Sequence, residues 1–243
     1  MTDDLEVHRK RNWVATIGTL VVLVLLSLFV AQILHYTNEI KSGKIDPSTF
    51  NFRQEFSSNV KLAAIPLSAA QVDVMSASAP SLGRADAPLT IVEFADFGCP
   101  YSRQSSFVMR ELSLKYPDKI RFIYRDFPVL DLHPIAQKAA EAGKCANDQG
   151  QFWQYHDKLY QNQLDLSVDQ LYQYAASLNL NKDVFRSCLD SGKHREAVLK
   201  DYQDGLTAGV RGTPTFFING SKVEGAVPKA IFEQLIQANT SNE

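Results

Sequence analysis

A hydrophobic strand that runs directly into a cysteine at the start of a helix is the feature that most constrains this chain. Residues 89–102 read LTIVEFADFGCPYS, and the short, apolar, β-branched run at 89–94 is typical of a buried strand. Good helix formers follow Cys99 up to Tyr116, and Pro100 suits the first helical turn, where its missing N–H is not needed. Cys99 is therefore predicted at a helix N-terminus, where free N–H groups and the helix dipole favour the reactive thiolate.

Glu93 is a carboxylic acid inside this apolar strand. Alternation places it on the opposite face from Val92 and Phe94. Because burial of a carboxylate is costly, two interpretations stand side by side. Glu93 is either a partly exposed strand acid or a proton acceptor close to Cys99, and it is a candidate catalytic residue on the second interpretation.

An uncharged segment of 22 residues, 13–34, dominates the N-terminal region. As a helix it would be about 33 Å long, enough to span the hydrocarbon core of a membrane, and Arg9, Lys10 and Arg11 precede it directly. We therefore predict a cytoplasmic tail at 1–12, a single transmembrane anchor at 13–34 and an extracytoplasmic location for all that follows. A cleaved signal peptide is the alternative, although the apolar region is long and shows no clear small-residue cleavage site.

The rest of the chain divides into a stalk and one domain. Residues 35–80 have no helical or strand period, which predicts a stalk with one short helix near 48–57. The domain is assigned to residues 81–243. Its expected elements are strands at 89–94, 119–129, 215–218 and 222–225, a helical insertion at about 133–208, and a closing helix at 228–238.

Four local signals mark the boundaries of these elements. Ser167 and Gln170 have the spacing of a capping box. Asn181 is a predicted N-cap, and Gly192 is the predicted end of the helix that follows it. Asn219-Gly220 predicts a tight hairpin between the last two strands.

Charge and histidine placement argue against several classes of protein. The net charge of −2 provides no basic field for a nucleic-acid partner. The five histidines show no ligand spacing with one another or with the cysteines, so neither a metal nor a cofactor is predicted. His156 alternates with aromatic residues and is predicted to lie in the core or at its boundary. A Cys–His protease would need a histidine beside Cys99, and the strand–cysteine–helix context argues against that class.

Two motifs that lie far apart in the sequence resemble one family. The stretch FADFGCPYS at 94–102 and the stretch GVRGTPTFFING at 209–220 are similar to the DsbA-like branch of the thioredoxin superfamily. The similarity covers roughly residues 80–238. It implies an α/β thioredoxin fold with a helical insertion.

The resemblance also changes the interpretation of Thr213-Pro214. From the residues alone, a proline that opens a strand is an ordinary trans residue. The resemblance instead implies a cis bond in a loop opposite the reactive cysteine, with Thr213 close to the thiol. Pro100, Tyr101, Thr213 and Pro214 are then the candidate substrate-binding residues.

The chain has three cysteines, Cys99, Cys145 and Cys188. An odd number in an exported protein points to one free thiol or to an intermolecular partner. Cys145 and Cys188 are either two inert core cysteines or a structural disulfide, and the resemblance implies the disulfide. Cys99 then remains as the single reactive thiol.

The chain departs from the Cys-x-x-Cys site of that family at Ser102. Cys99 can form a mixed disulfide with a cysteine-containing protein or a small thiol, but a serine hydroxyl is too weak a nucleophile to release it. Ser102 is instead predicted to donate a hydrogen bond to the Cys99 thiolate. Another thiol must resolve the mixed disulfide, and the redox partner is unknown. The sequence leaves open whether Ser102 is natural or an engineered substitution that traps mixed disulfides.

Three functional hypotheses follow. The first is a bacterial, membrane-anchored thiol–disulfide oxidoreductase that acts by monothiol exchange or isomerisation. The second is a thioredoxin-fold module that captures peptides without turnover, and the third is an assembly protein held above the membrane by its stalk. Glu93, Cys99, Pro100 and Thr213-Pro214 together favour the first, since a scaffold needs none of their chemistry.

Overall fold

The computed structural model describes residues 19–24, 26–32, 35, 74–76 and 78–240, which belong to two units, 1–61 and 62–243. In the first unit the described residues are helical. No helix within the described residues is both long and apolar enough to cross a membrane. The predicted anchor lies partly outside these residues, and the predicted short helix near 48–57 lies entirely outside them.

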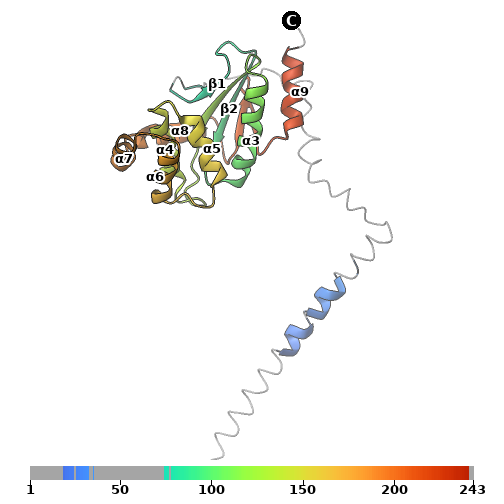
Figure 1. The fold of residues 1–243 in the computed structure, drawn as a ribbon. Helices are drawn as coiled ribbons and strands as arrows, with labels where there is room; N and C mark the ends of the chain where they lie inside the picture. Colours follow the sequence, from blue (N-terminus) through green and yellow to red (C-terminus); the bar gives the residue numbers. More distant parts are fainter. Residues whose placement is uncertain (1–18, 25, 33–34, 36–73, 77, 241–243) are drawn as a thin grey trace, which may run out of the picture. The chain divides into compact units, whose positions relative to one another are not determined.

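The second unit is built on a five-stranded sheet in the order β1-β3-β2-β4-β5 (Figure 1). Its central strand β2 pairs in parallel with β3 and antiparallel with β4. The edge strands β1 and β5 pair antiparallel with β3 and β4. The strands are β1 (Ser81–Leu82), β2 (Leu89–Ala95), β3 (Ile120–Asp126), β4 (Thr215–Ile218) and β5 (Ser221–Glu224).

Seven helices complete the described part of this unit, and five of them form the insertion between β3 and β4. The parallel β2–β3 pair needs a crossover, which α3 provides. The helices are α3 (Pro100–Lys115), α4 (Ala136–Asn147), α5 (Phe152–Gln161), α6 (Val168–Ser177), α7 (Lys182–Ser191), α8 (Arg195–Thr207) and α9 (Lys229–Thr240). This order agrees with the predicted thioredoxin fold and its helical insertion.

Both faces of the sheet are covered. On one face Ile91, Phe122 and Phe216 join the large core that the sheet shares with α3, α9 and the insertion helices. On the other face Phe94 and its neighbours pack against α8 and the segment before β1. Both faces of β2 are therefore shielded from solvent. A charged side chain on either face must form a hydrogen bond or an ion pair, or else lose its charge.

The local signals were mostly correct. Asn181 accepts hydrogen bonds from two backbone N–H groups at the start of α7, and Gly192 ends that helix in a left-handed conformation. The Asn219-Gly220 hairpin between β4 and β5 is also confirmed. The capping box was wrong, because the Ser167 hydroxyl donates to Asp165 instead of capping α6.

Three further differences concern the bounds of the strands and of the domain. The strand predicted at 119–129 ends at Asp126. The Phe127 N–H still donates to the Ala95 carbonyl of β2, but Pro128 has no N–H with which to continue the ladder. β1 was not predicted, since two residues carry no periodic signal. The structure also packs Val74 into the core beside the sheet, upstream of residue 81, where the domain was placed from the sequence.

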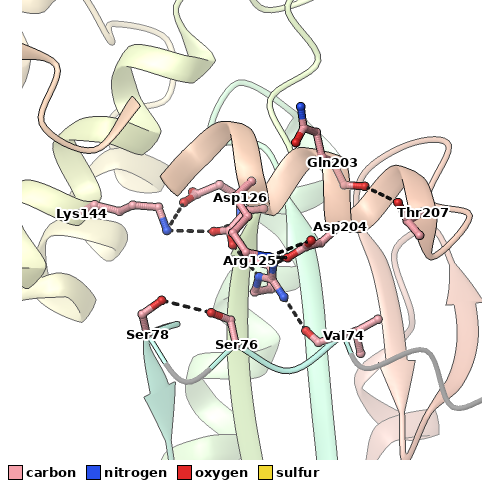
Figure 2. Close-up of polar contacts among 11 residues, drawn as sticks. Val74, Ser76, Ser78, Arg125, Asp126, Lys144, Gln203, Asp204 and Thr207 are labelled. Carbon is pink, nitrogen blue, oxygen red and sulfur yellow. Dashed lines mark hydrogen bonds and ion pairs between the residues drawn. The ribbon is translucent and has the colours of Figure 1, made fainter. Parts of the chain in front are cut away.

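The packing of Val74 depends on a buried arginine in β3. The side chain of Arg125 is 1% exposed, and its guanidinium donates to Asp201 at 2.7 Å. It also donates to Asp204 at 2.5 Å and to the Val74 carbonyl at 2.6 Å (Figure 2). One side chain thus connects the sheet, α8 and the segment before β1. Each of the three guanidinium nitrogens has an acceptor, as burial of a guanidinium requires.

A lysine continues the same network toward the insertion. Lys144 in α4 lies 3.1 Å from a carboxylate oxygen of Asp126 (Figure 2). The same ammonium lies 2.8 Å from a carboxylate oxygen of Asp201. Burial raises the pKa of Asp126 to about 6, and the charge of Lys144 opposes that rise. The network therefore connects α4 and α8 to β3, the strand adjacent to β2.

Replacement of Arg125 by methionine should destabilise this unit strongly. The change removes the cation at the centre of the network, so among the described residues Asp201 keeps only the cation of Lys144. Of the described cations, Asp204 keeps only the exposed Lys200. Breaking a buried ion pair in this way typically costs about 3–5 kcal/mol. Urea unfolding of the full chain measures the loss. Lys200→Ala is the matched control, because Lys200 pairs with the same Asp204 but is 71% exposed, so it should cost no more than about 1 kcal/mol. Equal losses in the two variants would contradict the assigned role of Arg125.

Candidate functional site

Cys99 occupies the N-cap position of α3, directly after the loop that follows β2. The residue is 6% exposed, and Pro100 begins the helix beside it. The thiol makes no capping hydrogen bond. Its sulfur instead donates to the backbone carbonyl of Thr213 at 3.2 Å, so the reactive atom faces a second segment of the chain.

That second segment is the loop before β4. The Thr213–Pro214 peptide bond is cis, as the resemblance implied. The loop meets Cys99 because β4 runs antiparallel to β2, with Phe94 opposite Thr215. The residues that leave the end of β2 and those that enter β4 therefore lie at the same edge of the sheet. This register brings Cys99 next to Thr213 and Pro214, although Cys99 and Thr213 are 114 residues apart in the sequence.

Ser102 lies in the first turn of α3 and is fully buried. Its hydroxyl oxygen accepts a hydrogen bond from the Asp96 N–H at 3.3 Å. Among the described residues there is no hydrogen bond between Ser102 and Cys99, so the partner predicted for Ser102 differs from the one observed. Pro100 and Tyr101, between these two residues, are exposed, and Tyr101 offers an aromatic ring to solvent beside the thiol.

Asp96 organises the loop that carries Cys99, and sequence analysis missed it. One carboxylate oxygen accepts from the Gly98 N–H at 2.6 Å, and the other lies 2.8 Å from both the Val129 N–H and Nδ1 of His133. A Cβ at position 98 would lie 2.5 Å from the His133 Cβ, so only glycine fits there. No local pattern connects residues 37 positions apart, so Asp96 and His133 carried no signal as a pair.

Gln163 holds the same loop from the insertion side. Its amide donates to the carbonyls of Phe97 and Cys99 at 2.7 and 2.9 Å. Arg103 in α3 donates to the Tyr160 carbonyl at 2.8 Å, which fixes the end of α5 against α3. These polar contacts to backbone atoms hold the thiol in place and could not be read from the sequence.

Glu93 is completely buried, so the interpretation as a partly exposed acid was wrong. Neither carboxylate oxygen has a hydrogen-bond partner in the described structure, and burial raises the pKa of Glu93 to about 8. The pKa of Tyr160 is raised, mainly by burial and then by the charge of Glu93. The charge of Cys99 also raises it. The Tyr160 hydroxyl lies 3.0 Å from that of Tyr124, and Tyr124 is paired with Glu93 in the β2–β3 register. Glu93 is mostly protonated at neutral pH.

The other two cysteines are joined in a disulfide between α4 and α7. Cys99 is thus the free thiol of the chain. Metal ligands were not expected from the spacing of the histidines. In the described part of the chain, one group of suitable side chains does lie close together, formed by Cys145, Cys188 and His194.

Fold and site together define a class of protein. A thioredoxin-like sheet, a helical insertion and a cysteine at a helix N-terminus facing a cis-proline loop form an architecture that supports thiol–disulfide exchange. A sequence model of the family described as thioredoxin matches residues 76–238. The chain therefore belongs to the thioredoxin family.

Solved structures share this fold at low sequence identity. BdbD from Bacillus subtilis, in its oxidised form, is 22% identical with a TM-score of 0.61, covering 68% of this chain and 94% of its own. A thioredoxin-like oxidoreductase from Silicibacter pomeroyi is 22% identical with a TM-score of 0.63, covering 72% of this chain and all of its own.

Curated relatives are more similar in sequence but much longer. The Na(+)/H(+) antiporter NhaA 3 of Salinispora tropica is 41% identical over 143 residues, which is 59% of this chain and 22% of that protein. The NhaA antiporter of Herminiimonas arsenicoxydans is 33% identical over 157 residues, 65% of this chain and 25% of its own length. The chain spans about a quarter or less of the length of these relatives. Their antiport activity is therefore a property of those longer proteins and is not assigned to this chain.

Glu93→Gln should stabilise the protein at alkaline pH. The pKa of Glu93 is about 8 in the folded protein, compared with an ordinary value of 4.5. The folded state therefore binds the proton more tightly than the unfolded state. Stability of the parent therefore falls as pH rises between these two values. The glutamine variant lacks this fall and should exceed the parent at pH 8 by a few kcal/mol, on the order of 1.4 kcal/mol per pKa unit.

Denaturant unfolding at pH 5 and pH 8 measures this difference. Glu196→Gln, at an exposed position of α8, is the matched control and should follow the parent at both values. A Glu93→Gln advantage that is equal at pH 5 and pH 8 would show that Glu93 is not an acid with a raised pKa.

Proposed function

We propose that this chain is a membrane-anchored thiol–disulfide exchange protein that works through the single thiol of Cys99. The observation that carries the proposal is the contact of the Cys99 sulfur with the Thr213 carbonyl, 3.2 Å away beside a cis proline. A thiol confined between a helix N-terminus and this loop is presented to a substrate in one orientation. The anchor at 13–34, a cytoplasmic N-terminus and an extracytoplasmic domain belong to the proposal and follow from the charge and hydropathy of the first 35 residues.

The chemistry proposed is exchange with no net oxidation. The Cys99 thiolate attacks one sulfur of a substrate disulfide, forms a mixed disulfide and expels the other sulfur as a thiolate. A second thiolate then attacks the mixed disulfide and restores Cys99. If that thiolate comes from the same substrate, the result is isomerisation, and if it is a small thiol, the result is removal of the adduct.

Exposed apolar side chains around the thiol support a polypeptide substrate. Tyr101 is 63% exposed, and Leu132 and Leu164 are fully or largely exposed. Leu132 precedes His133, which packs on Gly98, and Leu164 follows Gln163, which binds the Cys99 carbonyl. These side chains lie in segments held against the cysteine loop, where a cysteine-containing protein would make apolar contacts.

Cys99→Ala should abolish covalent capture of a substrate. The full chain in detergent, incubated with an oxidised cysteine-containing peptide, should form a mixed disulfide that mass spectrometry assigns to Cys99. The alanine variant should form none, because the other two cysteines are bonded to each other. Peptide binding of equal strength by parent and variant, with no covalent adduct in either, would instead identify a peptide-binding module.

Ser102→Cys should add the resolving step that the parent lacks. The new thiol would lie in the same helical turn as Cys99 and could attack the mixed disulfide within the molecule, which favours release strongly over reaction with a thiol from solution. We expect release of glutathione from glutathionylated Cys99 at least about tenfold faster than in the parent.

Ser106→Cys is the matched control for this experiment. It places a thiol at another buried serine of α3, one turn and about 6 Å further along the helix, where it cannot reach Cys99. Its release rate should equal that of the parent. Equal acceleration by both cysteines would show that proximity to Cys99 does not control release.

A further inference from the structure

The disulfide between α4 and α7 has a histidine and a carboxylate beside it. The two sulfurs and a ring nitrogen of His194 all lie within 4.8 Å of one another. Asp148 lies against the same group, with one carboxylate oxygen 2.8 Å from Nε2 of His194 and 3.8 Å from the sulfur of Cys188. Two sulfurs, an imidazole and a carboxylate are the donor types that Zn²⁺ prefers.

Three helix ends hold these donors together. Cys145 and Asp148 stand at the C-terminal end of α4, and Cys188 lies near the end of α7. Gly192, with a φ of 65°, reverses the chain after α7, and the Lys193 N–H donates back to the Cys188 carbonyl. This turn brings His194, at the N-cap position of α8, back over the cysteine.

We propose that the reduced form of the Cys145–Cys188 pair, together with His194, binds a divalent zinc ion. Asp148 supports the site, either as the acceptor that orients the histidine ring or as an oxygen ligand. The bonded sulfurs need only separate to about 3.8 Å, the distance between two thiolates on one tetrahedral ion with Zn–S bonds of about 2.3 Å. The helix ends that carry the donors keep their positions.

The redox and proton balance is simple. An external dithiol reduces the disulfide with two electrons and is itself oxidised to a disulfide, which leaves thiols on Cys145 and Cys188. Binding of Zn²⁺ displaces both thiol protons to solvent and forms two metal–sulfur bonds. An external disulfide then accepts two electrons from the two thiolates and, with two protons from solvent, becomes a dithiol, which restores the Cys145–Cys188 bond and releases the metal. The pair therefore alternates between a covalent and a metal crosslink of the same two helices.

The proposed zinc site is open to solvent on the side of His194 and Asp148, where the ammonium of Lys193 pairs with the carboxylate. The cysteines are buried, whereas the side chains of His194 and Asp148 are 18% and 28% exposed. Lys193 lies 2.8 Å from the same Asp148 carboxylate and is 57% exposed. A cation that enters from this side displaces the ammonium, and the lysine moves into solvent. The site uses none of the residues around Cys99 and does not depend on the proposed function.

Cobalt binding to the full chain tests the site. The test uses the Cys99→Ala background, so that Cys145 and Cys188 are the only thiols, and compares oxidised protein with protein reduced by dithiothreitol and then freed of it without air. We expect the reduced protein to take up one Co²⁺ with thiolate charge-transfer and tetrahedral ligand-field bands, and Zn²⁺ to displace it. Zn²⁺ should also raise the unfolding temperature of the reduced protein only.

Neighbouring variants give opposite expected results. His194→Ala should weaken Co²⁺ binding at least about tenfold, and Asp148→Asn should weaken it about 10–100-fold, as loss of a supporting carboxylate does. Lys193→Ala should bind as well as the parent or more tightly, since it removes a competing cation. The unfolding midpoint of each oxidised variant checks that its fold is intact.

Three outcomes would overturn the proposal. The first is reduced protein without the tetrahedral cobalt spectrum. The second is a His194→Ala variant that binds Co²⁺ like the parent while its oxidised form is folded. The third is loss of helical circular dichroism on reduction that Zn²⁺ does not restore, because the donors would then not be held in place.

Discussion

The antiparallel pairing of β2 with β4 is the constraint on which the site depends. Because Phe94 lies opposite Thr215, the chain that leaves β2 and the chain that enters β4 meet at one edge of the sheet. Cys99 and the Thr213–Pro214 loop are therefore neighbours by register. A slip of one residue would turn every side chain of β4 to the opposite face. It would separate the ring of Phe216 from that of Phe232 in α9 and carry Thr213 away from the thiol.

The two faces of the central sheet handle buried charge in opposite ways. On one face, Arg125 has three acceptors, in α8 and at Val74. These contacts offset the free-energy cost of burying its charge. On the other face, Glu93 has no partner and avoids the cost by keeping its proton, which is why its pKa rises. The first arrangement organises structure. The second leaves a proton held by a group that can release it near neutral pH, and unsatisfied groups of this kind concentrate at functional sites.

Structural features that depend on neighbouring residues, such as caps and tight turns, could be predicted from the sequence. Features that depend on tertiary contacts could not. Asn181 and the Asn219-Gly220 turn act through backbone geometry within a few residues, and both were correct. Ser167 had the same kind of signal and failed, because its hydroxyl donates to Asp165 and accepts no backbone N–H of α6. Asp96 meets His133 only when the segment after β3 folds against the end of β2. Cys145 meets Cys188 and His194 only when α4 packs against α7 and α8. Position 93 is intermediate, since alternation gave its face while its complete burial depended on the helices that cover it.

Ser102 shows why a single-thiol site fits this loop. Its hydroxyl oxygen accepts from the Asp96 N–H, and the Asp96 side chain in turn accepts from Gly98 and Val129. The serine thus supports the residue that shapes the approach to Cys99. A thiol is a weak hydrogen-bond acceptor and would support Asp96 less well. A chain that keeps serine here gains a firmly held loop and loses the internal route for releasing a mixed disulfide. On the proposed function, every covalent adduct of Cys99 then persists until a thiol from outside the domain arrives, and the chemistry is controlled by which thiols can reach the cis-proline loop.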